Sequence, residues 1–219
     1  MITEDVIKNN EQIRTYITKA DEALVALGYT EHSFAHVTKV ARFAKQLMLD
    51  LGYGGRKAEL AWIAGYLHDI GNVINRIDHA QSGAVMAFWL LNNLGADAEE
   101  LSTIISAIGN HDESTAFPVN EVAAALILAD KTDVRRSRVR NADFATFDIH
   151  DRVNYAVVDS TTSLAEDKKA ILLSVTIDTE ISPVMDYFEI FLDRMLLCRK
   201  AAEKLGLKFQ LEINGQSIL

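Results

Sequence analysis

The sequence has few of the residues from which disulfides, linkers and membrane spans are built. Cys198 is its only cysteine, so an internal disulfide and a cluster of thiolate metal ligands are both excluded. Two prolines and 11 glycines among 219 residues argue against long linkers or low-complexity segments. The longest uninterrupted apolar run, 122–129, is far too short to cross a bilayer.

Positive charge is also scarce. There are 22 lysines and arginines against 31 aspartates and glutamates, a net charge of -9. The broad basic surface typical of nucleic-acid-binding proteins is therefore missing, and nucleic acid is not an expected partner. The first 14 residues are polar and contain no apolar signal-peptide core. We expect a cytoplasmic protein without a membrane partner.

Apolar residues recur at helical spacing through the first two thirds of the chain. Ser33 is placed to cap one helix, whose apolar positions keep 3–4 spacing until Gly52. Gly71 follows another helix and is suited to end it. Pro118 suits the first turn of a helix that is apolar nearly all round and should be buried. The predicted helices span 4–27, 33–51, 56–68, 79–93, 97–110 and 119–132.

The pattern changes after about residue 142, where β-branched residues become frequent. We predict a mainly α fold, with a helical bundle over residues 1–145 and a small α/β (β-β-α-β) appendage over residues 146–219. The appendage is predicted to contain strands at 154–159 and 170–177, a turn at 160–169 between them, a helix at 183–205 and an edge strand at 207–213.

The last predicted strand alternates openly between apolar and polar residues. Pairing with the same element of a second subunit would cover its edge and an apolar face. We therefore expect a homodimer built partly through residues 151–219. A small-ligand sensing role is the alternative use of this appendage.

Histidine and aspartate residues gather at the ends of the predicted helices. Taken singly, each would be a helix cap or a satisfied polar group, and His150, which lies outside the pattern, is expected to have no catalytic role. Taken together, residues at the ends of successive helices can converge, and helical bundles build metal sites from facing helices. The residues in question are His36, His68, Asp69, His79, His111 and Asp130.

This ordered set resembles the HD-domain metal-dependent phosphohydrolases, and specifically their binuclear subset, over about residues 30–140. The segment 128–135, LADKTDVR, is similar to the final motif of bacterial hydrolases of symmetrical dinucleoside polyphosphates. The segments 68–71, HDIG, and 110–113, NHDE, are similar to the HD-GYP cyclic-dinucleotide phosphodiesterases. Two departures stand out: the sequence STAFP replaces the Gly-Tyr-Pro signature after His111, and Asn72 stands where both groups often have lysine.

The resemblance implies a ligand set and a reaction. One metal ion would be held by His36, His68, Asp69 and Asp130, and Asp69 would bridge to a second ion held by His79 and His111. Imidazole and carboxylate ligands without thiolate favour Fe, Mn, Co, Ni or Zn over Mg. A metal-activated hydroxide would then cleave a phosphoester or phosphoanhydride bond of a nucleotide or another small phosphorylated molecule.

Phosphoryl transfer also needs fixed cations against the developing negative charge. Lys131 and Arg135 are expected to act catalytically in this way. Arg76, between the His-Asp pair and His79, is a further candidate to bind substrate, with a solvated loop charge as the alternative. His32, four residues before His36, is another candidate to bind substrate, and it could also be a ligand, a neighbour of the ligands or a proton carrier.

Two other functions are compatible with the same residues. A regulatory module without catalytic activity could keep the metal site as a ligand sensor. Some HD-type sites bind O₂ as di-iron oxygenases, and the ligand set does not distinguish this chemistry from hydrolysis.

Overall fold

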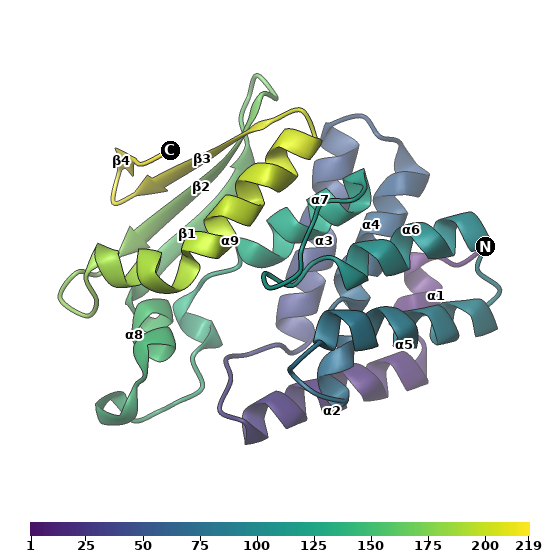
Figure 1. Ribbon diagram of the computed structural model, residues 1–219, viewed down its shortest axis with the longest axis horizontal. Helices are drawn as coiled ribbons and strands as arrows, with labels where there is room; N and C mark the ends of the chain where they lie inside the picture. The colour runs from purple at the N-terminus through teal and green to yellow at the C-terminus, as the bar shows by residue number, and fades with distance from the viewer.

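Helices dominate the first two thirds of the chain, and a small sheet follows them, in the computed structural model, which describes residues 1–219 (Figure 1). The mainly α class with a small α/β appendage is thereby confirmed. The helical part contains α1 (Glu4–Lys8), α2 (Glu11–Ala26), α3 (Phe34–Asp50), α4 (Gly55–Leu67), the 3₁₀ helix η1 (Ile70–Val73), α5 (His79–Asn93), α6 (Ala98–Gly109) and α7 (Glu121–Lys131). After the 3₁₀ turns η2 (Arg136–Arg138) and η3 (Phe144–Thr146) come α8 (Ile149–Ala156), β1 (Val157–Leu164), β2 (Ala170–Ile177), α9 (Val184–Lys204), β3 (Lys208–Ile213) and β4 (Gln216–Ser217).

Helix α7 lies at the centre of the molecule. Its apolar run 122–129 is completely buried, as its uniform hydrophobicity predicts. Helices α3, α4 and α6 pack against it, and α9 of the appendage packs against it as well. The hydrophobic core is therefore continuous from the helical part into the appendage. The end of α7 carries Asp130, so this packing fixes the position of that carboxylate.

The predicted first helix, 4–27, is in fact two helices. Asn10 interrupts it, because the Asn10 side chain accepts a hydrogen bond from the backbone N–H of Ile13 (3.0 Å) and caps α2. Ser33 caps α3 as predicted, by accepting from the N–H of Ala35 (3.2 Å). Pro118 lies ahead of α7 and not in its first turn, since Asn120 is the cap.

Gly71 does not end a helix as predicted but lies inside η1. A Cβ atom added there would lie 2.0 Å from the carbonyl oxygen of His79 and 2.5 Å from the backbone nitrogen of Gly83. Only glycine permits this approach. It allows η1 to pack against the start of α5, which brings His79 close to the His68-Asp69 pair.

The appendage starts differently from the prediction. Residues 154–156 form the last turn of α8, whose N-terminus is capped by Asp148 through the N–H of Asp151 (2.8 Å). The segment from Ser160 to Leu164, predicted to be a turn, pairs with β2 in an antiparallel register. Serine and threonine are compatible with this exposed strand, so their polarity alone was misleading.

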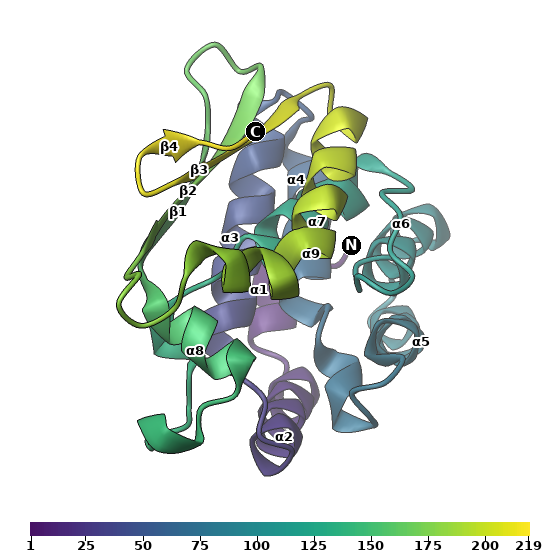
Figure 2. The same cartoon turned by 60° about the vertical axis from the view of Figure 1, so that its left-hand side comes forward.

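The sheet has the order β1-β2-β3-β4. Strands β2 and β3 are parallel, with α9 as the crossover helix, and β4 returns after a tight turn at Asn214-Gly215. The prediction of 207–213 as an edge strand is therefore confirmed as a strand but wrong at its end, because β4 pairs with Glu212 and Ile213 on the side of β3 away from β2. The long free edge is β1, and α9 lies between the sheet and α7 (Figure 2). No helix is long and apolar enough to span a bilayer.

Candidate metal centre

Six buried side chains from five segments meet beside the end of α7. His36 lies in the first turn of α3, His79 is the first residue of α5, and Asp130 is in the last turn of α7. The remaining three follow helices: His68 and Asp69 come after α4, and His111 comes after α6. All six are at most 9% exposed. The structure thus brings together the complete set of ligands suggested by the sequence.

Each of the four imidazoles is held through its Nδ1 atom. In His68, His79 and His111 this atom faces a backbone carbonyl oxygen three residues earlier, at 2.8, 3.0 and 2.6 Å respectively. In His36 it faces Oδ2 of Asp133 at 2.8 Å. These partners only accept hydrogen bonds, so Nδ1 of each ring carries a proton. Nε2 is consequently the atom of each of the four rings that a metal ion would bind, with loss of any proton it carries.

The two carboxylate oxygens of Asp69 face two different groups of ligands. Oδ2 lies 3.2 Å from Nε2 of His68 and 3.7 Å from Nε2 of His36. Oδ1 lies 3.5 Å from Nε2 of His79 and 4.0 Å from Nε2 of His111. This is the geometry expected of a carboxylate that bridges two ions.

Asn72 fixes the orientation of that carboxylate. Its side-chain amide donates to Oδ1 of Asp69 (3.0 Å) and to the Asp69 carbonyl oxygen (2.9 Å). Asn72, which stands where the sequence resemblance leads us to expect lysine, thus orients the proposed bridge without adding a charge.

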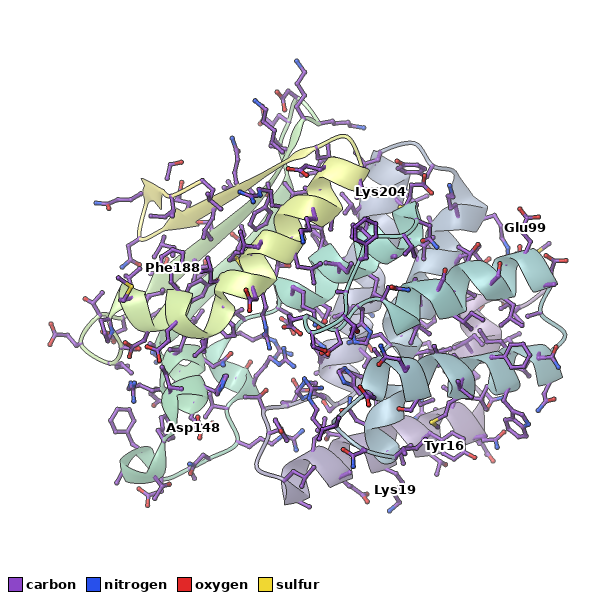
Figure 3. All side chains as sticks on the ribbon, in the orientation of Figure 1. Tyr16, Lys19, Glu99, Asp148, Phe188 and Lys204 are labelled. Carbon is purple, nitrogen blue, oxygen red and sulfur yellow. The ribbon has the colours of Figure 1, made fainter.

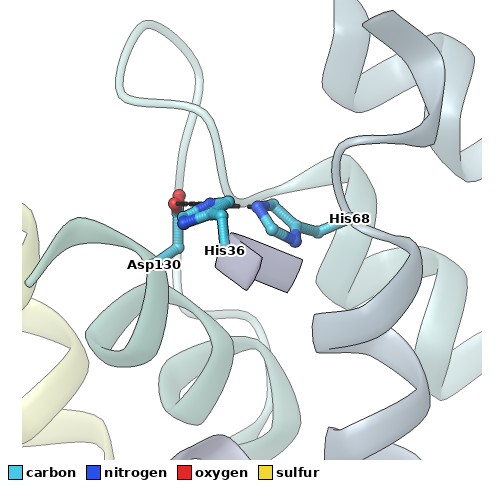
Figure 4. Close-up of side chains that lie close together, drawn as sticks. All are labelled: His36, His68 and Asp130. Atoms are coloured by element: carbon cyan, nitrogen blue, oxygen red, sulfur yellow. Dashed lines mark ion pairs between the residues drawn. The ribbon is translucent and has the colours of Figure 1, made fainter. Parts of the chain in front are cut away.

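His36, His68 and Asp130 form the second half of the centre (Figure 4). Oδ1 of Asp130 lies 3.3 Å from Nε2 of His36 and 3.6 Å from Nε2 of His68. Two ligands of one ion, each about 2.1 Å from it, are separated by distances of this size. Nε2 of both histidines and Oδ2 of Asp69 are buried without a hydrogen-bond partner. Because buried polar atoms without a partner are costly, the three atoms fit a bound cation.

The electrostatics of the centre also favour a cation. Burial lowers the pKa of His68, but the charges of Asp69 and Asp130 outweigh burial and raise this pKa to about 10. Burial lowers the pKa of His79 and His111, which keeps both rings neutral, the form that binds metal. The His36 side of the centre therefore attracts positive charge, while the His79 side presents neutral donors.

Lys131 and Glu113 lie beside the proposed ligands. The Lys131 ammonium group is buried between Oδ2 of Asp130 (2.7 Å) and Oε2 of Glu113 (2.9 Å). Burial lowers the pKa of Lys131, but these two carboxylates outweigh it and raise the pKa above its usual value. Lys131 is thus a permanent cation next to Asp130.

A cavity of about 460 Å³ opens onto the centre. Asp69, Asp130, Lys131, Arg76 and His32 contribute to its wall, as do His79 and His111. Burial, and then the charge of Arg138, lower the pKa of His32 well below its usual value. A neutral His32 at the cavity wall suits contact with a metal ion, its ligands or a substrate better than it suits a proton carrier, which must take up a proton near neutral pH.

Arg135 does not line the cavity. Its Nε atom lies 3.1 Å from Oδ1 of Asp133, and a terminal amino group lies 3.0 Å from Oε2 of Glu31. Arg135 is therefore engaged by Asp133 and Glu31 and is not among the residues that line the cavity.

The appendage contributes side chains to the same cavity that the sequence pattern did not indicate. Helix α9 provides Arg194 and Phe191, and the region of α8 provides His150 and Asp148, which is labelled in Figure 3. Arg138, in η2, is a further lining residue. Arg138 lies in the segment 131–140, where five of ten residues are basic, but Arg194 lies in an ordinary amphipathic helix and has no distinguishing sequence feature.

Comparison with known proteins agrees with this geometry. Residues 33–135 match the family model of the HD domain. The chain is also similar to the uncharacterized protein MJ1020 of Methanocaldococcus jannaschii, with 26% identity over 203 residues that cover 82% of this chain and 77% of the relative. All six proposed ligands lie inside the matched region, whereas Arg138 and Arg194 lie outside it.

Proposed function

Because residues 33–135 are an HD domain, we propose that this protein is a metal-dependent phosphohydrolase of that superfamily. The substrate is a nucleotide or another small phosphorylated molecule, and the bond cleaved is a phosphoester or a phosphoanhydride. The cofactor is a pair of divalent transition-metal ions bound by His36, His68, Asp69 and Asp130 and by Asp69, His79 and His111.

The observation that carries this proposal is the convergence of the four Nε2 atoms on the two oxygens of Asp69. Each ring is oriented by an acceptor at Nδ1, so the positions of the Nε2 atoms are fixed before any ion binds. Without a bound metal ion this arrangement would destabilise the fold, because two Nε2 atoms and one carboxylate oxygen are buried without hydrogen-bond partners.

Two divalent ions, when bound, supply a nucleophile from water at neutral pH and neutralise charge on phosphoryl oxygens. The side chains of this chain then have separate tasks. Asp69 joins the two halves of the centre, and Asn72 holds its carboxylate in place. Lys131, fixed by Asp130 and Glu113, contributes positive charge at the cavity wall where negative charge develops.

Replacing the bridge tests this function. In Asp69→Ala, both halves of the centre lose a ligand, so we expect loss of bound metal and loss of phosphate release together, by about three orders of magnitude or more. Metal content is measured by elemental analysis. Turnover is measured with nucleoside monophosphates, dinucleoside polyphosphates, cyclic dinucleotides and p-nitrophenyl phosphate.

Asp50→Ala is the matched control, because Asp50 lies at the end of α3 away from the cavity. Unchanged hydrolysis in Asp69→Ala would refute the proposal. Metal binding without hydrolysis of any substrate would favour the ligand-sensing module, and O₂ consumption without phosphate release would favour a di-iron oxygenase.

The homodimer remains a proposal, with a changed interface. Helix α9 already covers the apolar face of the sheet, and β4 pairs with the end of β3, so that β1 presents the longer free edge. We therefore assign the dimer contact to the free edge of β1. Light scattering at micromolar concentration tests it, and a monomer would rule it out.

A further inference from the structure

Two arginines outside the HD domain line the cavity in front of the proposed metal centre. Arg138 lies in η2, directly after the domain, and Arg194 lies in the middle of α9. Both contribute to the wall that Asp69, Asp130 and Lys131 also form. Neither has been given a task in the proposed hydrolysis so far.

Arg138 is held in one orientation by the backbone. Its side chain is 5% exposed, its Nε atom donates to the carbonyl oxygen of Glu31 (2.9 Å), and Nη1 donates to the carbonyl oxygen of Asp133 (2.9 Å). No protein acceptor binds Nη2. A buried guanidinium group that keeps a free donor at a cavity wall is prepared for an acceptor from a ligand.

Arg194 is oriented by an aromatic ring and a carboxylate. Its guanidinium carbon lies 4.7 Å from the centre of the Phe191 ring, and its Nε atom pairs with Oε1 of Glu113. The terminal amino groups have no hydrogen-bond acceptor in the protein. Because Glu113 also binds Lys131 through its other oxygen, one carboxylate ties Arg194 to the charged wall beside Asp130.

The two guanidinium groups repel each other across the cavity. Burial lowers the pKa of Arg138, the charges of Asp133 and Asp130 raise it, and the positive charge of Arg194 lowers it again. An anion bound in the cavity would stabilise two guanidinium groups that line it, because it would accept hydrogen bonds from their free donors and offset their repulsion. Guanidinium groups match the geometry of phosphate oxygens because their donors form a planar fork.

We propose that Arg138 and Arg194 together bind a phosphate-type oxyanion of the substrate, so that η2 and α9 complete a site that the HD domain leaves unfinished. The identity of the anion as phosphate rests on the proposed function, but its binding requires no hydrolysis. The proposal assigns to Arg138 and Arg194 the anion contact that the sequence suggested for Arg135, whose donors are used by Asp133 and Glu31.

Binding of inorganic phosphate to the metal-loaded, full-length protein tests this site. In isothermal titration calorimetry, we expect Arg194→Gln to raise the dissociation constant by about tenfold or more, because one charged donor pair is lost. Arg194→Lys keeps the charge without the planar fork and should restore part of the affinity. Arg199→Gln is the matched control, since Arg199 is exposed on the same helix and does not line the cavity.

Arg138 needs a milder change, because its contacts with two backbone carbonyls also support the fold. Arg138→Lys should weaken phosphate binding by a similar factor, with thermal unfolding measured in parallel to show that the protein is intact. Equal phosphate affinity in Arg194→Gln, Arg199→Gln and the unchanged protein would overturn the proposal, as would absence of phosphate binding by the unchanged protein at millimolar concentration.

The outcome is distinguishable from a failure of the proposed function. Hydrolysis together with unaltered phosphate affinity in Arg194→Gln would refute the arginine pair and leave the hydrolase standing. Weakened phosphate binding in Arg194→Gln, in a protein that hydrolyses none of the tested substrates, would support the pair and refute the hydrolase.

Discussion

The two walls of the cavity are built in different ways. On the HD side, the six proposed ligands are buried, and every imidazole is fixed through Nδ1. On the appendage side, His150 is exposed and the Arg194 side chain is 27% exposed. The HD side is therefore preorganised to bind metal ions. The appendage side instead presents partly solvated side chains to a ligand in the cavity.

This difference indicates on which side of the cavity a substitution should reduce the stability of the protein. A buried site whose orientation depends on backbone contacts tolerates little displacement, so substitutions there should affect fold and metal binding together. Substitutions on the appendage side should change ligand affinity and leave the fold intact. The predictions below challenge this contrast, beginning with the largest effect.

Gly71→Ala should damage the HD side most severely. The added methyl group would lie 2.0 Å from a backbone oxygen, which cannot rotate away as a side chain can. Helix α5 must then move away from η1, so we expect a loss of roughly 3 kcal/mol or more in the free energy of unfolding, together with weaker metal binding. Urea unfolding and elemental analysis measure the two effects.

Gly109→Ala provides the comparison for that variant. At Gly109 an added Cβ would make only an ordinary contact with Ala84, at 3.5 Å. Its stability should therefore be close to that of the unchanged protein. If both variants unfolded at the same urea concentration as the unchanged protein, the close approach of η1 and α5 would have no energetic importance.

Asp133→Asn should have a smaller but still large effect. Asp133 accepts from Nδ1 of His36 and is buried against Lys39, Arg135 and Arg138. The amide has the same shape, but it lacks the charge that holds the His36 ring and balances the buried Arg138. We expect metal affinity to fall by about 10- to 100-fold, and the free energy of unfolding to fall by about 3 kcal/mol.

Competition with a chelator measures the metal affinity of Asp133→Asn. Asp193→Asn is the control, since Asp193 is exposed on α9. Metal affinity within twofold of the unchanged protein would show that the carboxylate behind His36 does not orient it, and the contrast between the two walls would lose its main support.

Glu100→Gln should have the smallest effect and lies away from both walls. A hydrogen bond from Arg56, at 2.5 Å between Nε and Oε1, lowers the pKa of Glu100 below its usual 4.5. A carboxyl group with a lowered pKa stabilises the fold above pH 4.5, and this contribution is lost as the pH falls through its lower, folded-state pKa. The pair is partly exposed, so the contribution at neutral pH is at most about 1 kcal/mol.

The pH dependence identifies that contribution. The difference in unfolding free energy between Glu100→Gln and the unchanged protein should be greatest at pH 7 and should vanish in strong acid. Glu99→Gln, at an exposed neighbouring position, should show no such trend. A difference that stays constant from pH 7 to pH 3 would mean that the ion pair is not its source.

The sequence predicted the HD side well for a physical reason. Its proposed ligands lie at helix ends, where the apolar periodicity stops and a His or Asp is conspicuous. The ranges of α5 and α7 could therefore be predicted together with the positions of His79 and Asp130. The appendage side lacks that contrast. Arg194 looks like any surface residue of an amphipathic helix, and only the packing of α9 against α7 turns it toward the cavity.

Local polarity also misled the prediction of the appendage. The segment from Ser160 to Leu164 is polar because one face of β1 is exposed, and not because it turns. The edge assigned to 207–213 is shorter than predicted, because the two residues of β4, which were too few to predict, pair with the end of β3 after Asn214-Gly215. The Asn10 side chain caps the start of a new helix, α2, where apolar periodicity alone predicted one continuous helix.

The central claim is that the buried His-Asp set holds two metal ions that serve phosphate release. Its most direct test is elemental analysis of anaerobically purified protein, combined with phosphate release before chelation, after chelation and after metal is restored. We predict two first-row transition-metal ions per chain, with phosphate release that disappears on chelation and returns with the metal. Protein that binds no such ions, or that releases phosphate equally well after complete chelation, would contradict the claim.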